Sequence, residues 1–418
     1  MVPATGHERQ ERKVMDEETI FREFFRNKTI LVTGAAGTVG RELVSQLIGL
    51  EPGEIRLFDN NESELFFLND EYRETGRVRC YLGDIRDAQK LLNLTKAVDL
   101  VFHTAAFKHV ILSEYNPFDA VQTNINGVKN IVQAAMANNV GRVIFTSSDK
   151  AVNPTNVMGT SKLMGERIIT AANIVNNNGP QVFSSVRFGN VLGSRGSVVP
   201  IFANQILRGE PVTITDVRMT RFVMTVREAA RLVIEGAVLS CGGEVFVTKM
   251  PVMRIVDLAR TMIEMLAPVA GIEPDAVPVK IIGAKPGEKL YEELMSQEEV
   301  ARVKELPSMF AILPALRSFY HRIDYRYADM LPNQNITNPY ISSSQIPMAV
   351  EEINVYMEDN GILDEYFGPN LSRTPDNGRG TTLRLDKAAQ GHLHKEPTNG
   401  EDASDAGVLR MARAEHGR

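Results

Sequence analysis

Thr29-Ile-Leu-Val-Thr-Gly-Ala-Ala-Gly-Thr-Val-Gly-Arg41 places Gly34, Gly37 and Gly40 between an apolar run and the start of a helical pattern. Glycine lets the chain turn tightly and lets a pyrophosphate approach the backbone amides at the positive end of a helix. The stretch therefore predicts a dinucleotide-binding turn, with Thr38 and Val39 in the first turn of the helix. The alternative is a tight strand-to-helix turn without a ligand.

The next predicted strand ends at Asp59, nineteen residues after Gly40. A carboxylate at this place can accept hydrogen bonds from the adenosine ribose hydroxyls of a dinucleotide. Residues 59–62 include no basic side chain to meet a 2′-phosphate, so the sequence favours NAD over NADP. Arg41 and Arg56 are the two basic residues that could fold in and reverse this preference.

Short β-branched runs alternate with longer helical patterns along the first half of the chain, which predicts βαβ units. Several of the runs are almost entirely apolar, as strands covered on both faces should be. We therefore expect an α/β fold: a Rossmann-type, doubly wound parallel sheet with a smaller C-terminal substrate domain. The predicted strands are residues 29–33, 55–58, 77–81, 100–103, 143–147 and 182–186.

Composition changes along the chain divide it into five predicted parts. They are an N-terminal extension (1–26), an NAD-binding domain (27–190), a substrate-binding domain (191–330), a C-terminal extension (331–369) and a tail (370–418). The substrate domain could be discontinuous, because residues 227–239 form a helical pattern that could pack back on the sheet. The tail is polar and poor in aromatic residues, which predicts disorder.

The overall composition excludes several classes of protein. A formal net charge of -6 gives no broad electrostatic footprint for nucleic acid. The two cysteines, Cys80 and Cys241, have neither metal-site spacing nor a secretory leader, so we expect reduced thiols and no metal site. No apolar run reaches the ~18 residues that a membrane span needs. The sequence therefore predicts a cytoplasmic protein that binds neither nucleic acid nor membranes.

The chain resembles the extended short-chain dehydrogenase/reductases, and within them the UDP-N-acetylglucosamine 4,6-dehydratases of polysaccharide biosynthesis. The resemblance covers roughly residues 27–296, and the run Ser-Asp-Lys-Ala-Val-Asn-Pro at 148–154 is its most specific part. The matching stretches are residues 33–40, 103–110, 114–117, 147–154, 156–162 and 187–193.

The resemblance implies a Tyr-x-x-x-Lys pair, but Met158 stands at the tyrosine position, with Lys162 retained. A thioether has no proton to exchange, so Met158 cannot be the general base. The chain is thus similar to a methionine-bearing branch of the dehydratases. Lys162 is implied to hold the nicotinamide ribose and to add positive potential.

The resemblance also implies that Asp149 is the acid for the departing C6 hydroxyl and that Lys150 is the base at C5. A basic Lys150 needs a lowered pKa, which a desolvated site beside the positive nicotinamide would supply. For the C4 hydroxyl proton the acceptor stays open: Ser148, Asp149 or a water. The alternative for the Asp149–Lys150 pair is a solvated turn after a strand.

Softer signals come from the remaining matches. Asp84 and Ile85 follow the third predicted strand and are expected to cover the adenine, or else to form an ordinary turn. Arg221 suits a diphosphate because its guanidinium is a planar fork, and its alternative is a helix-start ion pair. The other expected ligand residues are Ala105 for the cofactor and Lys108, His109, Asn190, Val198 and Glu288 for the sugar nucleotide.

The sequence thus predicts an NAD-dependent lyase that removes water from a UDP-sugar, UDP-N-acetylglucosamine above all, to give a 4-keto-6-deoxy product. A nucleotide-sugar epimerase and a non-catalytic NAD-binding sensor are the alternatives. Loss of the tyrosine favours the sensor, while the intact Asp149–Lys150 pair speaks against it. A homo-oligomer is also expected, because members of the family that the chain resembles commonly form dimers.

Overall fold

The computed structural model describes residues 16–175, 180–283, 287–320, 323–327, 330–331, 336–367, 373–374 and 382–383. The chain forms two compact units, Met1–Leu363 and Asp364–Arg418. In the second unit the described residues form a 3₁₀ turn (Asp364–Tyr366) and the antiparallel pair β17 (Arg373–Thr374) and β18 (Thr382–Leu383). The rest of the tail predicted to be disordered lies outside the described residues.

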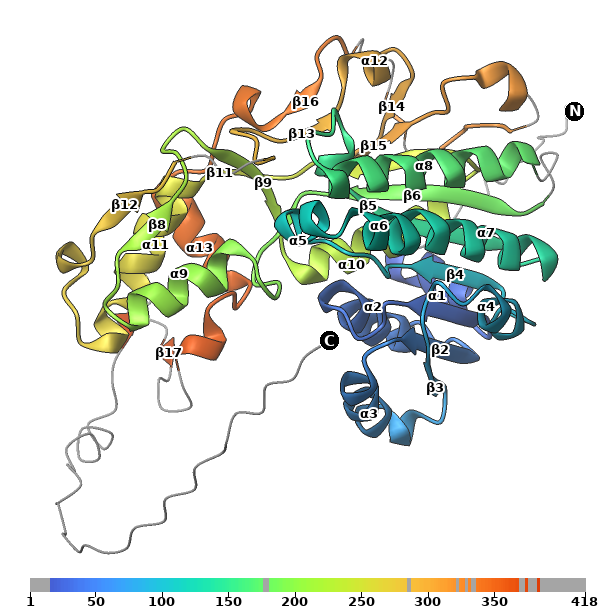
Figure 1. The fold of residues 1–418 in the computed structure, drawn as a ribbon, viewed down its shortest axis with the longest axis horizontal. Coiled ribbons are helices and arrows are strands. Elements are labelled where there is room, and N and C mark those ends of the chain that lie inside the picture. Colours follow the sequence, from blue (N-terminus) through green and yellow to red (C-terminus); the bar gives the residue numbers. More distant parts are fainter. Residues whose placement is uncertain are drawn as a thin grey trace, which may run out of the picture. The chain divides into compact units, whose positions relative to one another are not determined.

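A nine-stranded sheet forms the centre of the first unit, in the order β14-β15-β10-β6-β5-β4-β1-β2-β3 (Figure 1). The strands β1 to β6 and β10 run parallel, whereas β14 and β15 are antiparallel additions at one edge. The predicted doubly wound fold is therefore confirmed. The bounds are β1 (Thr29–Thr33), β2 (Glu54–Asp59), β3 (Val78–Leu82), β4 (Leu100–His103), β5 (Arg142–Ser148), β6 (Val182–Phe188), β10 (Val245–Thr248), β14 (Val303–Glu305) and β15 (Met309–Ile312).

Helices cover both faces of this sheet because the central strands are apolar on both sides, with β4 buried at every residue. One face packs against α1 (Glu17–Phe25), α2 (Thr38–Gly49), α3 (Glu62–Glu71) and α10 (Val226–Leu239). The other packs against α4 (Ala88–Leu94), α7 (Gly127–Ala137) and α8 (Val157–Val175). The short helices α5 (Val110–Tyr115) and α6 (Pro117–Ala120) and a π-helical turn (Val121–Asn126) lead into α7.

A smaller lobe beside the sheet holds α9, α11 and α13 (Figure 1). Its strands pair as β7-β9-β11 and β8-β12. A separate pair, β13 with β16, lies near β14 and β15 (Figure 1). The bounds are β7 (Asn190–Val191), α9 (Val198–Leu207), β8 (Val212–Ile214), β9 (Thr220–Met224), β11 (Val252–Arg254), α11 (Ile255–Leu266), β12 (Val279–Ile281), β13 (Glu293–Met295), α12 (Gln297–Val300), β16 (Tyr340–Ile341) and α13 (Val350–Asp359).

The chain passes from the sheet to the smaller lobe more than once. The helix α10 and the strands β10, β14 and β15 belong to the sheet although they lie beyond residue 190. A single boundary at residue 190 therefore cuts through the sheet. The helix α10 returns because Thr225 and Glu228 form a capping box and its apolar face is buried.

None of the helices among the described residues is long and apolar enough to span a membrane.

Candidate active site

The glycine turn joins β1 to α2 as predicted, and close backbone packing demands two of its glycines. Gly34 has a φ of 70°, and a Cβ there would lie 2.6 Å from the amide nitrogen of Ala105. At Gly40 a Cβ would lie 2.2 Å from the carbonyl oxygen of Gly34. Gly37 is the N-cap of α2 and offers no side chain to its amides. The first turn of α2 thus keeps the amides that an anion binds.

A cavity of about 340 Å³ opens beside this turn. Asp59, Asp84, Ile85 and Ala105 line it together with Gly34 and Gly37. The Asp59 carboxylate accepts hydrogen bonds from the amides of Ala36 (3.0 Å) and Asn61 (3.0 Å), which fixes it at the end of β2. The residues predicted to hold adenosine therefore do share one cavity, in which apolar side chains and the carboxylates of Asp59 and Asp84 lie together.

The two arginines that could favour NADP are bound elsewhere. Arg41 forms ion pairs with Glu64 (2.7 Å) and Glu71 (3.1 Å). Arg56 donates to the carbonyl oxygens of Leu94 (2.7 Å) and Lys96 (2.8 Å). Neither arginine lines the 340 Å³ cavity. The two arginines that do line it are paired with carboxylates, Arg86 with Asp84 at 2.6 Å and Arg195 with Glu64 at 3.1 Å, which favours NAD over NADP.

A second cavity, of about 800 Å³, contains all five predicted catalytic side chains. Ser148 ends β5, Asp149 and Lys150 form the turn after it, and Met158 and Lys162 lie one helical turn apart at the start of α8. Gly37, Thr38, Val39 and Gly40 line the same cavity. The parallel strands bring these groups together because the carboxyl ends of β1 and β5 lie at one edge of the sheet.

Asp149 is the ionised carboxylate of the pair predicted to be catalytic. Its side chain is 1% exposed, accepts from Ser148 Oγ at 2.5 Å and binds Lys150 Nζ at 3.1 Å. Burial raises the pKa of Asp149, but the Lys150 ammonium and the hydrogen bond from Ser148 outweigh it and hold that pKa below its usual range. A carboxylate bonded to a hydroxyl is equipped to accept a proton through it.

Lys150 differs from the sequence-based expectation of a lowered pKa. Burial does lower it, but the carboxylates of Asp149 and Glu292 outweigh burial and raise the pKa of Lys150 above its ordinary value. Burial and the nicotinamide charge would lower this pKa, whereas the second carboxylate, Glu292, lies far from Lys150 in the sequence. A base role for Lys150 therefore requires that one of these two negative charges be neutralised first.

Lys162 and His103 are both deeply buried. Lys162 Nζ donates to the carbonyl oxygen of Thr146 at 2.9 Å, and burial lowers the pKa of Lys162 to about 8. His103 bonds through Nδ1 to Thr33 Oγ1 (2.7 Å), and burial together with the charge of Lys162 lowers its pKa to about 3. His103 is fully buried and lines neither cavity. We interpret it as a neutral core histidine.

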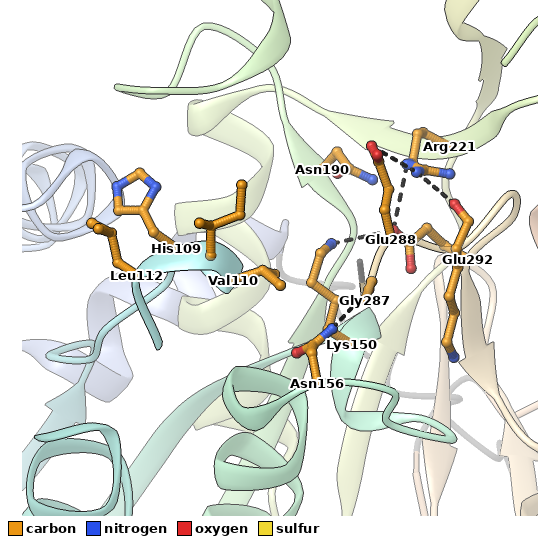
Figure 2. A pocket seen from close by; sticks show the side chains of 12 residues that line it. His109, Val110, Leu112, Lys150, Asn156, Asn190, Arg221, Gly287, Glu288 and Glu292 are labelled. Atoms are coloured by element: carbon orange, nitrogen blue, oxygen red, sulfur yellow. Dashed lines mark hydrogen bonds and ion pairs between the residues drawn. The ribbon is translucent and has the colours of Figure 1, made fainter. Parts of the chain in front are cut away.

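A third cavity, of about 390 Å³, adjoins the catalytic one and is shown in Figure 2. The two cavities share His109, Leu112, Lys150 and Asn190. Of the other predicted substrate residues, Arg221 and Glu288 line the third cavity and Lys108 lines the catalytic one. Val198 is the exception: it lines none of the three cavities and only begins α9 next to Ser197, which does.

Glu292 is a site residue that the sequence did not reveal. Its side chain is 4% exposed, and Oε1 lies 3.3 Å from Lys150 Nζ and 3.4 Å from Arg221 Nε (Figure 2). The other oxygen, Oε2, is buried without a hydrogen-bond partner among the described residues. Burial, and then the Asp149 charge, raise the pKa of Glu292. No motif signalled it, because it stands before β13, far from the catalytic turn in sequence.

Arg221 does not present a free guanidinium to the cavity. Its terminal nitrogens donate to the carbonyl oxygens of Thr220 (2.8 Å), Leu290 (3.2 Å) and Lys289 (2.8 Å). Its Nε faces Glu292. In this arrangement Arg221 fixes the loop before β13 against β9, and its role as a diphosphate ligand remains a prediction.

A buried ion cluster holds the elements that carry these side chains. Arg187, 2% exposed, binds Glu166 of α8 at 2.7 Å and Glu299 of α12 at 2.8 Å. It also donates to the carbonyl oxygen of Leu294 in β13 at 3.0 Å. The cluster thus links the helix that carries Met158 and Lys162 to the strand that follows Glu292. Removal of one charge from such a buried cluster would leave its partners unpaired and would destabilise the protein.

Comparison with known proteins identifies the family: the chain belongs to the polysaccharide biosynthesis protein family, whose model matches residues 30–314. An uncharacterized membrane protein of Methanocaldococcus jannaschii is 49% identical, over 70% of this chain and 87% of that protein. A UDP-N-acetylglucosamine 4,6-dehydratase (inverting) of Campylobacter jejuni is 35% identical, over 72% of this chain and 87% of its own.

Epimerases are also among the relatives. A UDP-glucose 4-epimerase of Rickettsia bellii is 36% identical over 69% of this chain and 83% of its own. The chain thus belongs among nucleotide-sugar dehydratases and epimerases.

Solved structures agree with the fold. Pen from Bacillus thuringiensis is 40% identical with a TM-score of 0.74, over 81% of this chain and 99% of its own. The dTDP-glucose 4,6-dehydratase DesIV of Streptomyces venezuelae, solved with NAD and TYD bound, has a TM-score of 0.55 over 63% of this chain and 86% of its own. At 22% identity DesIV shows the shared fold alone.

The expected homo-oligomer and cytoplasmic location stay predictions. Large apolar side chains are exposed on α5, α6 and α8, which contact one another: Ile111, Leu112, Tyr115, Phe118 and Met164. Exposed apolar side chains of this kind are found at oligomer interfaces, and two of them, Ile111 and Leu112, also line the 390 Å³ cavity.

Proposed function

We propose that the protein is an NAD-dependent 4,6-dehydratase acting on a UDP-sugar, UDP-N-acetylglucosamine above all. The observation that carries this proposal is the position of Lys150, which lines both the catalytic cavity and the adjoining 390 Å³ cavity. An acid–base pair at that junction can act on C5 and C6 of a sugar whose C4 faces the nicotinamide. Bound NAD would take the hydride from C4 and return it to C6.

Asp149 replaces the missing tyrosine in the first step of this mechanism. The C4 hydroxyl proton passes to Ser148 Oγ as the Ser148 proton passes to Asp149, along the 2.5 Å hydrogen bond that joins them. The lowered pKa of Asp149 ensures that the carboxylate is ionised and ready to accept. Met158 only fills the position of the tyrosine, where it is 3% exposed.

The first step prepares the second, because a protonated Asp149 no longer stabilises the Lys150 ammonium. A neighbouring carboxylate favours the protonated amine, so its neutralisation lowers the pKa of Lys150. The Lys150 ammonium gives its proton to solvent, and the neutral amine then removes the C5 proton, which the C4 ketone has acidified. Asp149 gives its proton to the departing C6 hydroxyl, and water leaves. Lys150 returns a proton to C5, the hydride returns to C6, and Lys150 takes up a proton from solvent, which restores the ammonium beside the ionised Asp149.

The product distinguishes this reaction from that of an epimerase. We expect purified protein with UDP-N-acetylglucosamine to yield a nucleotide sugar lighter by one water molecule, measured by mass spectrometry. An isomer of unchanged mass would instead assign the chain to the epimerases, which share the C4 oxidation but need neither the C5 base nor the C6 acid.

Glu292 sets the pKa of Lys150 in this scheme. Glu292→Gln keeps the size of the side chain and removes its charge, so the pKa of Lys150 should fall. The limb of the pH–rate profile that reports the base should then move to lower pH. Glu293→Gln is the matched control, because the Glu293 carboxylate bonds to Asn153 instead. An unmoved limb in Glu292→Gln would leave Glu292 with a purely structural role.

A further inference from the structure

A bound NAD molecule would extend from the 340 Å³ adenosine cavity into the 800 Å³ catalytic cavity. The inference below rests on the proposed binding of NAD. The adenosine cavity and the catalytic cavity meet at six described residues that line both: Gly34, Gly37, Thr104, Ala106, Phe107 and Arg195. A dinucleotide with adenosine in one cavity and nicotinamide in the other carries its diphosphate across this junction. Arg195 supplies the charge among the six, and no sequence motif had marked it.

We propose that Arg195 binds the diphosphate of the bound dinucleotide and closes over it as a strap. Arg195 Nη2 donates to the carbonyl oxygen of Ala36 at 3.0 Å, so its guanidinium lies across the glycine turn. The first-turn amides of α2 would bind the diphosphate from one side, and Arg195, in the segment between β7 and α9, would bind it from the other. A guanidinium fork matches phosphate oxygens in charge and geometry.

Glu64 holds Arg195 at this place before a ligand arrives. Arg195 Nη1 lies 3.1 Å from Glu64 Oε1, while Arg41 Nη1 lies 2.7 Å from Glu64 Oε2. The Arg195 side chain is 59% exposed, so this ion pair is weak and exchangeable. A diphosphate can therefore replace Glu64 at low cost.

The segment that carries Arg195 also contacts the substrate side of the site. Lys108 Nζ donates to the carbonyl oxygen of Arg195 at 2.8 Å. Gly196 has a φ of 73°, and a Cβ there would lie 2.9 Å from the His109 ring. Arg195 is thus fixed between the cofactor and the residues expected to meet the sugar. Since dehydration regenerates NAD in every cycle, a strap that slows its release costs the enzyme nothing.

Calorimetric titration of the full chain with NAD, NADP, ADP, adenosine and UDP tests this inference. We expect Arg195→Gln to weaken NAD and ADP by the same factor, about 10- to 100-fold, and to leave adenosine and UDP unchanged. Arg195→Lys should retain part of the affinity, because it keeps the charge and loses the fork. Arg41→Gln is the control, because Arg41 is the other partner of Glu64 but lines neither cavity. The affinity of this variant for NAD and ADP should match that of the unmodified protein.

Three results would contradict the proposal that Arg195 binds the diphosphate. They are an unchanged affinity for NAD and ADP, an equal loss for adenosine, which would mean that Arg195 only shapes the adenosine cavity, and a loss confined to NADP or to UDP. Failure of the unmodified protein to bind NAD would refute the proposed cofactor instead, and the ADP titration would still decide the role of Arg195.

Discussion

Asp149→Asn should abolish the formation of NADH absorbance when the protein, NAD and UDP-N-acetylglucosamine are mixed in a single turnover. The amide keeps the shape of the side chain but cannot take the proton that Ser148 relays from the C4 hydroxyl. Removal of a general base costs about 10²–10⁴ in rate. Because Asp149 is also the proposed acid for the C6 hydroxyl, dehydration should fall at least as far.

Asp87→Asn is the matched control, since Asp87 caps α4 and asparagine caps equally well. Neither the catalytic nor the substrate cavity includes Asp87. NADH that forms at the parent rate in Asp149→Asn, with no dehydrated product, would assign the C4 proton to another acceptor. Asp149 would then keep only the acid role that the family resemblance implies.

Lys150→Met should separate oxidation from elimination. Asp149 and Ser148 remain, so C4 oxidation should proceed, though altered by the loss of the neighbouring ammonium. The C5 proton has no base, so NADH should accumulate, product should fall by about 10²–10⁴, and deuterium from D₂O should not enter C5. The measurements are NADH absorbance and NMR of the recovered sugar nucleotide.

Lys129→Met serves as the control, because Lys129 is exposed on α7 and lines neither the catalytic nor the substrate cavity. C5 exchange that persists undiminished in Lys150→Met would contradict the assignment of Lys150 as the base. Glu292 would then be the next carboxylate to test at that position.

Local patterns were enough to predict the sheet and the position of the catalytic side chains. Each predicted strand from 29–33 to 182–186 corresponds to one of β1 to β6, because apolar β-branched runs and glycine turns act over a few residues. Parallel strands bring their carboxyl ends to one edge of a sheet, so the sequence alone places Gly34, Asp59 and Asp149 at that edge.

Contacts between residues far apart in the sequence could not be predicted from local patterns. Glu292 contacts a lysine 142 residues earlier in the chain, and its place depends on the pairing of β13 with β16 and on the Arg187 cluster. The same contact adds to the larger effect of Asp149 in raising the pKa of Lys150. Arg195 was missed for a similar reason: its importance appears only where two cavities meet.

The most direct test of the central claim is the product that the unmodified protein makes from UDP-N-acetylglucosamine in D₂O, analysed by mass spectrometry and NMR. If the protein is a 4,6-dehydratase, we expect a 4-keto-6-deoxy sugar nucleotide that has lost one water. It should carry deuterium at C5, where the proton removed by Lys150 is replaced from solvent. A product of unchanged composition that differs only in configuration at C4, without deuterium at C5, would contradict the central claim.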